Sequence, residues 1–370
     1  MSVFYKKAKK LLKKPGFFLR DYFLNRYPLY QNEFLCPLQE EQIVIEHDLS
    51  LEQQLQCELP IDVVYTWVDH NDHRWSAKYR KYKNGDNYGE NATDLARFYN
   101  NNELFYSIKS IFKFIPWVRN IYIITDGQIP EWIDLFSKVI IVDHRDIIPS
   151  EFLPTFNSHV IEAYIHKINN LSEYFLYFND DVFVAREIPK SHFFKGNGVS
   201  SLFITKKSLN LMRDRGVNTP TLHACLNARE LLFNDYNVEI DIPLVHSYIP
   251  LRKSMYDKAF EKYKEKILSF SKNKFRTNND LNLATFLVPW YTYLHGCSVP
   301  YKDICYYFNI RSPVSIHIYK QLINSKGMPH SICANDVSQK DNSDVQHQNE
   351  LLNNMLSIVF GDKNEYKKTK

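Results

Sequence analysis

The fold follows from the stretch EYFLYFNDDVF, residues 173–183. Its first part, Tyr174 to Phe178, is apolar and aromatic on both faces, which is typical of a strand in the middle of a parallel sheet. This pattern ends abruptly in Asn179, Asp180 and Asp181. Open α/β sheets bind ligands at the carboxyl ends of their strands, and adjacent carboxylates are costly without a cation or hydrogen-bond donors. The stretch therefore indicates a metal and nucleotide-diphosphate site; the alternative is a simple turn, which Asn and Asp favour.

Strand and helix patterns alternate along the first half of the chain. They occupy 61–67, 104–115, 120–125, 138–142, 157–168 and 174–178. Such alternation predicts right-handed βαβ units, so we expect a Rossmann-like α/β fold with a mostly parallel sheet flanked by helices. The later half is mixed, with an added strand expected at 199–205 and a charged helix at 256–270. The predicted strands of the first half end in polar, mostly acidic loops, which indicates a site at their common edge.

Composition limits the class of protein. The 370 residues are 44% hydrophobic and 24% charged, as in soluble globular proteins, and suffice for one large domain or two ordinary ones. A net charge of +4 does not argue for a nucleic-acid partner, and we expect none. The 6 cysteines are scattered without a CxxC pair, so we expect free thiols in a reducing cytoplasm rather than a zinc or redox motif.

The two ends of the chain differ from its centre. Residues 1–30 interleave lysines and arginines with Phe, Tyr and Leu, which predicts a basic amphipathic segment on an anionic membrane surface. A solvated basic tail and an RNA-binding segment are the alternatives. No apolar core of a signal peptide follows the lysines, and no stretch has the ~20 apolar residues of a spanning helix. We expect a linker at 31–59, the main domain at 60–340 and a polar tail at 341–370.

Several blocks of the sequence carry a family resemblance. They are IDVVYTWVDHND (61–72), RFYNNNELFYSIKSIFKFIPWVRNIYIITDGQIPEW (97–132), VDHRDIIP (142–149), LPTFNSHVIEAYIHKINNLSEYFLYFNDDVF (153–183), HSYIPLRKSM (246–255), FRTNNDL (275–281) and SICAND (331–336). Together they resemble the Stealth family of hexose-1-phosphate transferases, which includes bacterial capsular-polysaccharide phosphotransferases and the catalytic part of the lysosomal-enzyme GlcNAc-1-phosphotransferase. The sequence departs from the family's usual pair of acids in the last block, because Val337 follows Asp336.

The resemblance implies a reaction. A sugar-1-phosphate, such as an N-acetylhexosamine-1-phosphate, moves from a UDP-sugar to a hydroxyl of an acceptor oligo- or polysaccharide, free or lipid-linked, and UMP is released. It implies a place in capsular or other exopolysaccharide synthesis, on the inner face of a bacterial plasma membrane. A metal-dependent glycosyltransferase that transfers the sugar alone and releases UDP is the alternative enzyme. A membrane-docked scaffold without activity is a further alternative, although it has no need of acidic strand ends.

The resemblance and the residue types together assign the candidate site. Asp180, Asp181 and Asp336 are the expected ligands of Mg²⁺ (or Mn²⁺), because hard cations prefer oxygen ligands. His246 is the expected base for the acceptor hydroxyl, and Arg276 the expected partner of phosphate oxygens. Donor-binding candidates are further polar residues of the matched blocks, namely Asp62, Asp69, Asp72, Arg97, Asn157, His159, Asn179 and Arg252.

Several of these residues have a structural alternative. Asp62 lies within an apolar strand pattern and can be a buried anchor rather than a site group. Asp69 and Asp72 can be solvated loop residues, and Asn157 can cap the helix that follows it. Arg276 can form a surface ion pair with Asp280 instead of binding phosphate.

Overall fold

The computed structural model describes residues 11–26, 32, 36–54, 57–83, 88, 92–93, 98, 102–312, 314–324, 328–336 and 345–361. Its strands are β1 (Ile61–Thr66), β2 (Ile121–Thr125), β3 (Val139–Asp143), β4 (Tyr174–Phe178), β5 (Val182–Val184), β6 (Ser200–Phe203), β7 (Ile249–Arg252), β8 (Ser298–Tyr301), β9 (Cys305–Asn309) and β10 (Ser331–Asn335). Its α-helices are α2 (Pro15–Arg26), α3 (Leu38–Gln54), α4 (His73–Tyr82), α5 (Glu103–Phe114), α6 (His144–Ile147), α7 (Ser158–Ala163), α8 (Lys190–Phe193), α9 (Leu209–Asp214), α10 (Pro220–Tyr236), α11 (Lys253–Lys262), α12 (Lys264–Ser271), α13 (Val288–Leu294), α14 (Ser315–Asn324) and α15 (Val345–Phe360).

A 5-stranded sheet of order β3-β2-β1-β4-β7 forms the centre of the molecule. β3, β2, β1 and β4 run parallel, and β7 is antiparallel to β4. Alternate residues of β4 face opposite cores: Leu176 and Phe178 enter one apolar cluster, and Phe175 and Tyr177 enter the other. A strand buried on both faces is continuously apolar. The expected Rossmann-like α/β class with a mostly parallel sheet is therefore confirmed.

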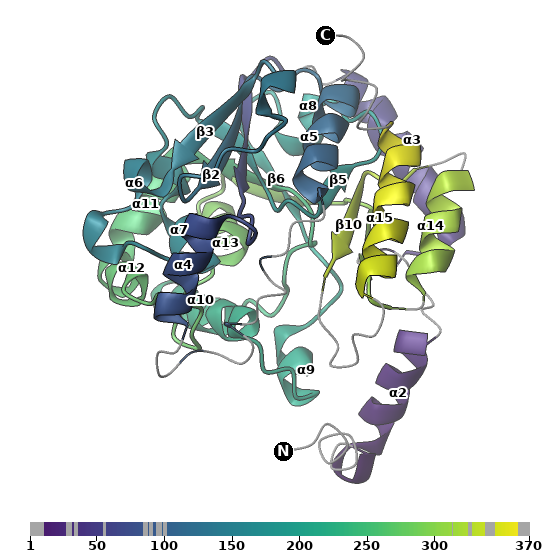
Figure 1. Ribbon diagram of the computed structural model, residues 1–370. Coiled ribbons are helices and arrows are strands. Elements are labelled where there is room, and N and C mark those ends of the chain that lie inside the picture. The colour runs from purple at the N-terminus through teal and green to yellow at the C-terminus, as the bar shows by residue number, and fades with distance from the viewer. Residues whose placement is uncertain are drawn as a thin grey trace.

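Helices cover both faces of this sheet, as Figure 1 shows. One core contains apolar residues of α5 and α15, and the other contains residues of α7, α10, α11 and α13. The two smaller sheets, of order β5-β10-β9 and β6-β8, include both parallel and antiparallel pairs, as expected for a mixed later half. β5 begins directly after Asp181 and pairs with β10, so the later half of the chain reaches the carboxyl end of β4.

Two expectations about the outer segments need correction. Most of the expected linker 31–59 is helix α3, whose Ile45 is buried in the first core and whose Glu41 accepts a hydrogen bond from the Tyr306 hydroxyl at 2.6 Å. The expected polar tail contains α15, which buries Leu352, Met355 and Phe360. Apolar residues spaced three to four apart among many Asn and Gln form its buried face. Residues 362–370 lie outside the described part.

The expected membrane segment 1–30 is described from residue 11 onward. It contains α2, whose Leu19, Tyr22 and Phe23 are exposed. Within the described ranges, every helix is too short or too polar to cross a lipid bilayer.

Candidate active site

The carboxylates of Asp180 and Asp181 lie at the carboxyl end of β4, as the sequence predicts. Asp180 and Asp181 lie in the turn between β4 and β5. The Asn179 carbonyl accepts from the Val182 amide at 3.3 Å, and the Asp181 carbonyl accepts from the Ala334 amide at 3.0 Å. These two backbone hydrogen bonds hold the turn between β4 and β5 and join it to β10.

Acidic crowding makes this turn a candidate cation site. Burial, and then the nearby charges of Asp181 and Glu103, raise the pKa of Asp180 well above its ordinary value. The Oδ1 atom of Asp181 is buried and has no hydrogen-bond partner among the described residues. A buried carboxylate oxygen without a donor is costly, and a divalent cation would relieve both the repulsion and the missing contact. The residues present therefore fit the expected cation.

A histidine and a cysteine from distant parts of the chain join Asp181. Ligand atoms of Asp181, His246 and Cys333 all lie within 4.8 Å of one another. The Cys333 thiol donates to Asp181 Oδ2 at 3.5 Å, and the exposed His246 ring lies 5.3 Å from the ring of Tyr307. The sequence contained no sign of a soft ligand at this position, so Cys333 is a functional candidate that sequence reasoning missed. Imidazole and thiolate broaden the range of metals that the site can bind.

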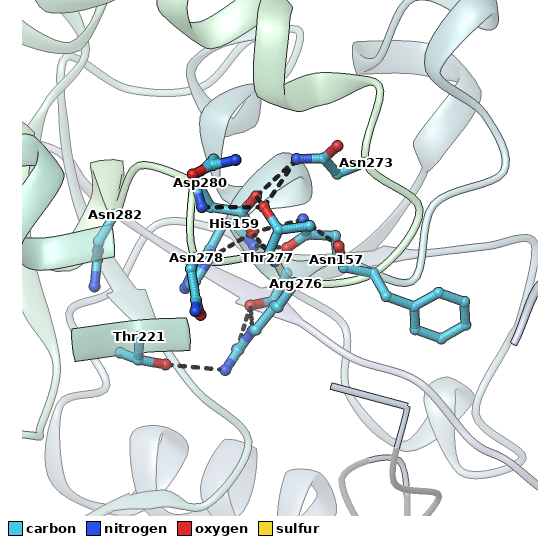
Figure 2. A network of polar contacts seen from close by, with 12 residues as sticks. Asn157, His159, Thr221, Asn273, Arg276, Thr277, Asn278, Asp280 and Asn282 are labelled. Carbon is cyan, nitrogen blue, oxygen red and sulfur yellow. Dashed lines mark hydrogen bonds and ion pairs between the residues drawn. The ribbon is translucent and has the colours of Figure 1, made fainter. Parts of the chain in front are cut away.

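Asp280 is the centre of a polar network (Figure 2). The network lies on the face of β4 from which Phe175 and Tyr177 enter the second apolar cluster. The Oδ2 atom of Asp280 accepts from Asn157 Nδ2 at 2.8 Å, His159 Nδ1 at 3.0 Å and the Thr277 amide at 3.0 Å. Its Oδ1 accepts from Asn273 Nδ2 at 3.0 Å and the Thr277 hydroxyl at 2.7 Å. These bonds tie the loop 273–280 to the start of α7. Asp280 is thus a central residue of the site, a role the sequence did not indicate.

Arg276 lies next to this network, and its described hydrogen bonds go to two hydroxyls rather than to Asp280. The guanidinium donates from Nε to the Ser158 hydroxyl at 3.1 Å, and from Nη1 to the Thr221 hydroxyl at 3.2 Å, as seen in Figure 2. The surface ion pair with Asp280 is absent among the described contacts, because Asp280 is fully occupied by other donors. Among the described residues the hydrogen-bond partners of Arg276 are neutral hydroxyls, while the charges of Glu162 and Asp280 act on it without a hydrogen bond. The positive charge of Arg276 is suited to an anionic ligand.

His159 is neutral in this setting. Burial, followed by the nearby charge of Arg276, lowers the pKa of His159. Its Nδ1–H donates to Asp280, which leaves Nε2 as the acceptor nitrogen of the ring. Burial raises the pKa of Asp280, but hydrogen bonds from His159, Asn157 and Thr277 outweigh it and lower that pKa. The pair is therefore a carboxylate with a neutral imidazole.

Tyr177 connects the Asp181 and Arg276 sides of the site. It is the penultimate residue of β4, and its hydroxyl lies 3.1 Å from the Thr66 hydroxyl at the end of β1. Burial and then the charge of Glu162 raise the pKa of Tyr177, while Arg276 lowers it and Asp180 raises it. Both charged groups are thus close enough to act on the same hydroxyl. The Asp180 carboxylate and the Arg276 guanidinium therefore both lie in the neighbourhood of the Tyr177 hydroxyl, near the carboxyl end of β4.

The β1–α4 loop lies along the same edge. Asp72 caps α4 by accepting from the Trp75 amide at 2.7 Å, and Asp69 accepts from the Asn71 amide at 2.9 Å. The Gln128 side chain bonds both the amide and the carbonyl of Asp69, at 3.0 and 2.7 Å. Asn157 caps α7 through the His159 amide at 3.1 Å. These residues hold the edge in shape, and each of the three expected donor contacts here has a structural task.

Two expected donor contacts lie at the opposite end of the sheet. Asp62 is the second residue of β1, and its buried carboxylate accepts from Arg119 at 2.8 Å and from the Ser172 amide at 2.7 Å. Arg252 pairs in register with Tyr174 at the amino end of β4, and its Nε donates to Glu173 at 3.1 Å. Both expectations are corrected, because these side chains are anchored away from Asp181. Arg97 lies outside the described residues.

Asp336 is also corrected as a metal ligand. Both of its oxygens accept from Arg311, Oδ1 from Nε at 2.7 Å and Oδ2 from Nη2. A bidentate guanidinium occupies the lone pairs that a cation would use. The charges of two acids that the sequence did not single out act on residues of this region: Glu103 raises the pKa of Asp180, and Glu162 raises the pKa of Tyr177. Neither follows a strand in sequence, so strand-end reasoning had no signal for them.

A second group of potential metal ligands, His192, Asp303 and His330, is completely buried away from the turn. Asp303 accepts from Tyr248 at 2.8 Å and from His192 Nε2 at 2.9 Å. The Nδ1 atom of His330 accepts from the Ile304 amide at 3.0 Å, so its lone pair is already used. This group is a satisfied internal network that connects Tyr248 to the start of β10.

Comparison with known proteins agrees with the motif resemblance. Residues 59–86 match Stealth protein CR1, conserved region 1, and residues 97–202 match Stealth protein CR2, conserved region 2. The capsular polysaccharide phosphotransferase LcbA of Aeromonas hydrophila is 49% identical over 358 residues, covering 95% of this chain and 99% of that protein. A capsular polysaccharide phosphotransferase of Actinobacillus suis is 50% identical over 362 residues, covering 94% and 97%. The phosphotransferase fcs1 of Haemophilus influenzae is 50% identical over 366 residues, covering 96% and 100%.

Among solved structures, the galactosyltransferase LgtC in complex with donor and acceptor sugar analogs is similar, with a TM-score of 0.43 and 10% sequence identity over 84% of this chain and 100% of that chain. A likeness of that size carries no argument about function. The sequence relatives do, because they match this chain over nearly their whole length. The chain therefore belongs to the Stealth family, alongside the capsular polysaccharide phosphotransferases, and is a transferase.

Proposed function

We propose that the chain transfers a sugar-1-phosphate, such as an N-acetylhexosamine-1-phosphate, from a UDP-sugar to a hydroxyl of an acceptor glycan in capsule synthesis. The observation that carries the proposal is the group of Asp181, His246 and Cys333 next to the turn after β4. Arg276 adds a positive charge that acts, like the charge of Asp180, on the nearby Tyr177 hydroxyl of the same strand. Transfer at phosphorus needs the diphosphate neutralised, the attacking hydroxyl positioned and the developing charge stabilised. The relatives' names support the same class of reaction.

In this proposal the acceptor oxygen attacks the β-phosphorus of the donor. A bond forms between that oxygen and the β-phosphorus, and the bond from the β-phosphorus to the oxygen bridging the two phosphates breaks, so UMP leaves. His246 takes the proton of the attacking hydroxyl. Arg276 holds phosphate oxygens through its planar fork, already oriented by Ser158 and Thr221.

Asp180 and Asp181 are the residues that would hold Mg²⁺ or Mn²⁺, with His246 and Cys333 adjacent. A bound divalent cation supplies charge neutralisation at the diphosphate. Arg252 lies at the amino end of β4, away from the turn that would hold the cation. Arg276 is therefore the basic residue proposed to bind the phosphate oxygens.

The nucleotide product tests the proposed function. Purified protein incubated with a UDP-sugar and a soluble acceptor should release UMP, and a donor labelled in its β-phosphate should leave the label in the glycan. Phosphorus NMR of the product should show a phosphodiester between sugars. Label recovered wholly in UDP would identify the alternative glycosyltransferase and overturn the proposal.

The role of His246 has a separate test. His246→Ala should lower turnover about 10²–10⁴-fold, because a general base acts on rate more than on ground-state binding. Donor affinity, measured by calorimetry, should change little. His317→Ala on α14 removes an equally exposed imidazole and should leave both quantities unchanged. An equal loss of donor affinity and turnover in His246→Ala would make the residue a donor contact.

A further inference from the structure

Helices α2 and α9 (Leu209–Asp214) lie on the same side of the molecule, below the body in Figure 1. The Lys14 ammonium, just before α2, donates to the carbonyl of Asp214, the last residue of α9. The N-terminal segment and α9 are therefore adjacent, although 200 residues separate the two partners. The exposed side chains of the two helices therefore belong to one continuous surface.

Both helices expose large apolar side chains. On α2, Leu19, Tyr22 and Phe23 are 48%, 49% and 54% exposed, and their spacing of three and four residues puts them on one helical face. On α9, Leu211 is 47% exposed. Scattered exposed apolar residues need no explanation, but a group on neighbouring elements marks an interaction surface.

The same surface is basic. Lys13 is exposed just before α2 and Arg20 on it, and the exposed Lys206 and Lys207 precede α9. On α9, Arg213 is exposed and lies 3.9 Å from the exposed Asp214, the one acid of that helix. Lysine and arginine interleaved with Leu, Tyr and Phe are the composition of segments that lie in the interface of anionic membranes. A polyanion in solution would bind the cationic side chains but would leave the apolar side chains without a contact. The charge and the apolar face together favour a lipid surface.

This surface adjoins the candidate active site. The Lys207 ammonium lies 5.3 Å from the centre of the Tyr307 ring. His246 also lies beside that ring, at 5.3 Å between ring centres. Tyr307 thus sits between the basic segment that precedes α9 and the histidine proposed as the base.

We propose that α9 is a second membrane-contact element, which together with α2 seats the catalytic edge against an anionic bilayer. The inference rests on the proposed function, because it explains how the acceptor hydroxyl of a lipid-linked glycan would reach His246. It goes beyond a basic N-terminal segment, since it assigns a contact in the middle of the chain. It also sets the orientation of the enzyme at the membrane.

The test uses the full chain and vesicles of phosphatidylcholine with phosphatidylglycerol. Leu211→Ser and Arg213→Ser should each weaken vesicle partitioning about fivefold. The first variant loses the partial burial of a leucine in the bilayer, and the second loses the attraction of one basic residue to the anionic surface. Matched controls remove the same side chains elsewhere: Ile358→Ser, 54% exposed on α15, and Arg80→Ser, exposed on α4. The controls should partition like the unchanged protein, and vesicles of phosphatidylcholine alone should bind all variants weakly.

Activity on a soluble acceptor separates this inference from the proposed function. Leu211→Ser and Arg213→Ser should retain it, since neither residue contacts the site. Release of UDP instead of UMP would overturn the proposed function and leave the partitioning result standing. Unchanged partitioning of both α9 variants, with binding lost on deletion of residues 1–26, would overturn the inference. So would unchanged partitioning together with lost affinity for soluble polyphosphate, which would make α9 a polyanion-binding surface.

Discussion

Asp181→Asn should lower turnover about 10²–10³-fold, equivalent to a loss of several kcal/mol of charge stabilisation at the diphosphate. The substitution preserves shape and removes one negative charge from the turn after β4. Initial rates of nucleotide release at saturating donor, across a titration of Mg²⁺ and of Mn²⁺, measure the effect. Asp134→Asn, an exposed carboxylate outside the site, is the matched control and should turn over normally.

The same variant should fold as well as the unchanged protein, or better. Side-chain bonding of Asp181 is limited to the weak thiol contact with Cys333 at 3.5 Å, and its Oδ1 atom has no partner among the described residues. Loss of its charge relieves the repulsion between Asp181 and Asp180. A thermal unfolding midpoint equal to or above that of the unchanged protein, measured without metal, is the expected result. Near-normal turnover at every metal concentration would remove Asp181 from the mechanism.

Asp280→Ala should lower the free energy of unfolding by about 3–5 kcal/mol, because each buried donor left without an acceptor costs about 1–3 kcal/mol. Asn157, His159, Asn273 and Thr277 all lose their shared acceptor. Urea denaturation at neutral pH measures the change. Asp257→Ala removes a carboxylate that is 43% exposed and bonded to Lys167, and should cost less than about 1 kcal/mol. A cost for Asp280→Ala as small as that of the control would contradict the role of the network.

The network also makes a prediction in acid. The folded-state pKa of Asp280 is below its ordinary value of 3.8, so its ionisation stabilises the fold above that pH. This contribution is lost as the pH falls from 3.8 through the folded-state pKa. Asp280→Asn cannot ionise and lacks the contribution. Below pH 3.8 this loss should make the difference in unfolding free energy between the two proteins shrink. Between pH 6.5 and pH 3.8 the difference also includes the titration of His159, whose pKa Asp280 raises, so the comparison is made below pH 3.8; a difference that does not shrink there would contradict the assignment.

The sequence alone determined the central strand and its polar end. Tyr174 to Phe178 is apolar at every position, and only a strand covered on both faces needs that. Since parallel strands end at one edge, the acids that follow them could be placed together from the strand pattern. Asp181 lies where that reasoning put it. The family blocks added His246 and Arg276, which local patterns could not relate to Asp181.

Only the tertiary structure decided the partners of these residues. Cys333 reaches Asp181 across 152 residues, and Asp280 reaches His159 across 121 residues, through pairings that no local period records. Arg311 likewise donates a hydrogen bond to the Asp336 carboxylate, a pairing that local patterns do not record. A charged residue in a sequence shows its chemistry but not whether a partner already uses it.

The direction of β7 relative to β4 was also determined only by the tertiary structure. β7 runs antiparallel to β4, which pairs Arg252 with Tyr174 and carries its charge to the amino end of the sheet. Had β7 run parallel to β4, the end of the strand and Arg252 with it would have lain near Asp180. The alternation of side chains along a strand is the same in either direction. The direction is set by how the connecting segments pack, so the sequence of the strand itself could not reveal it.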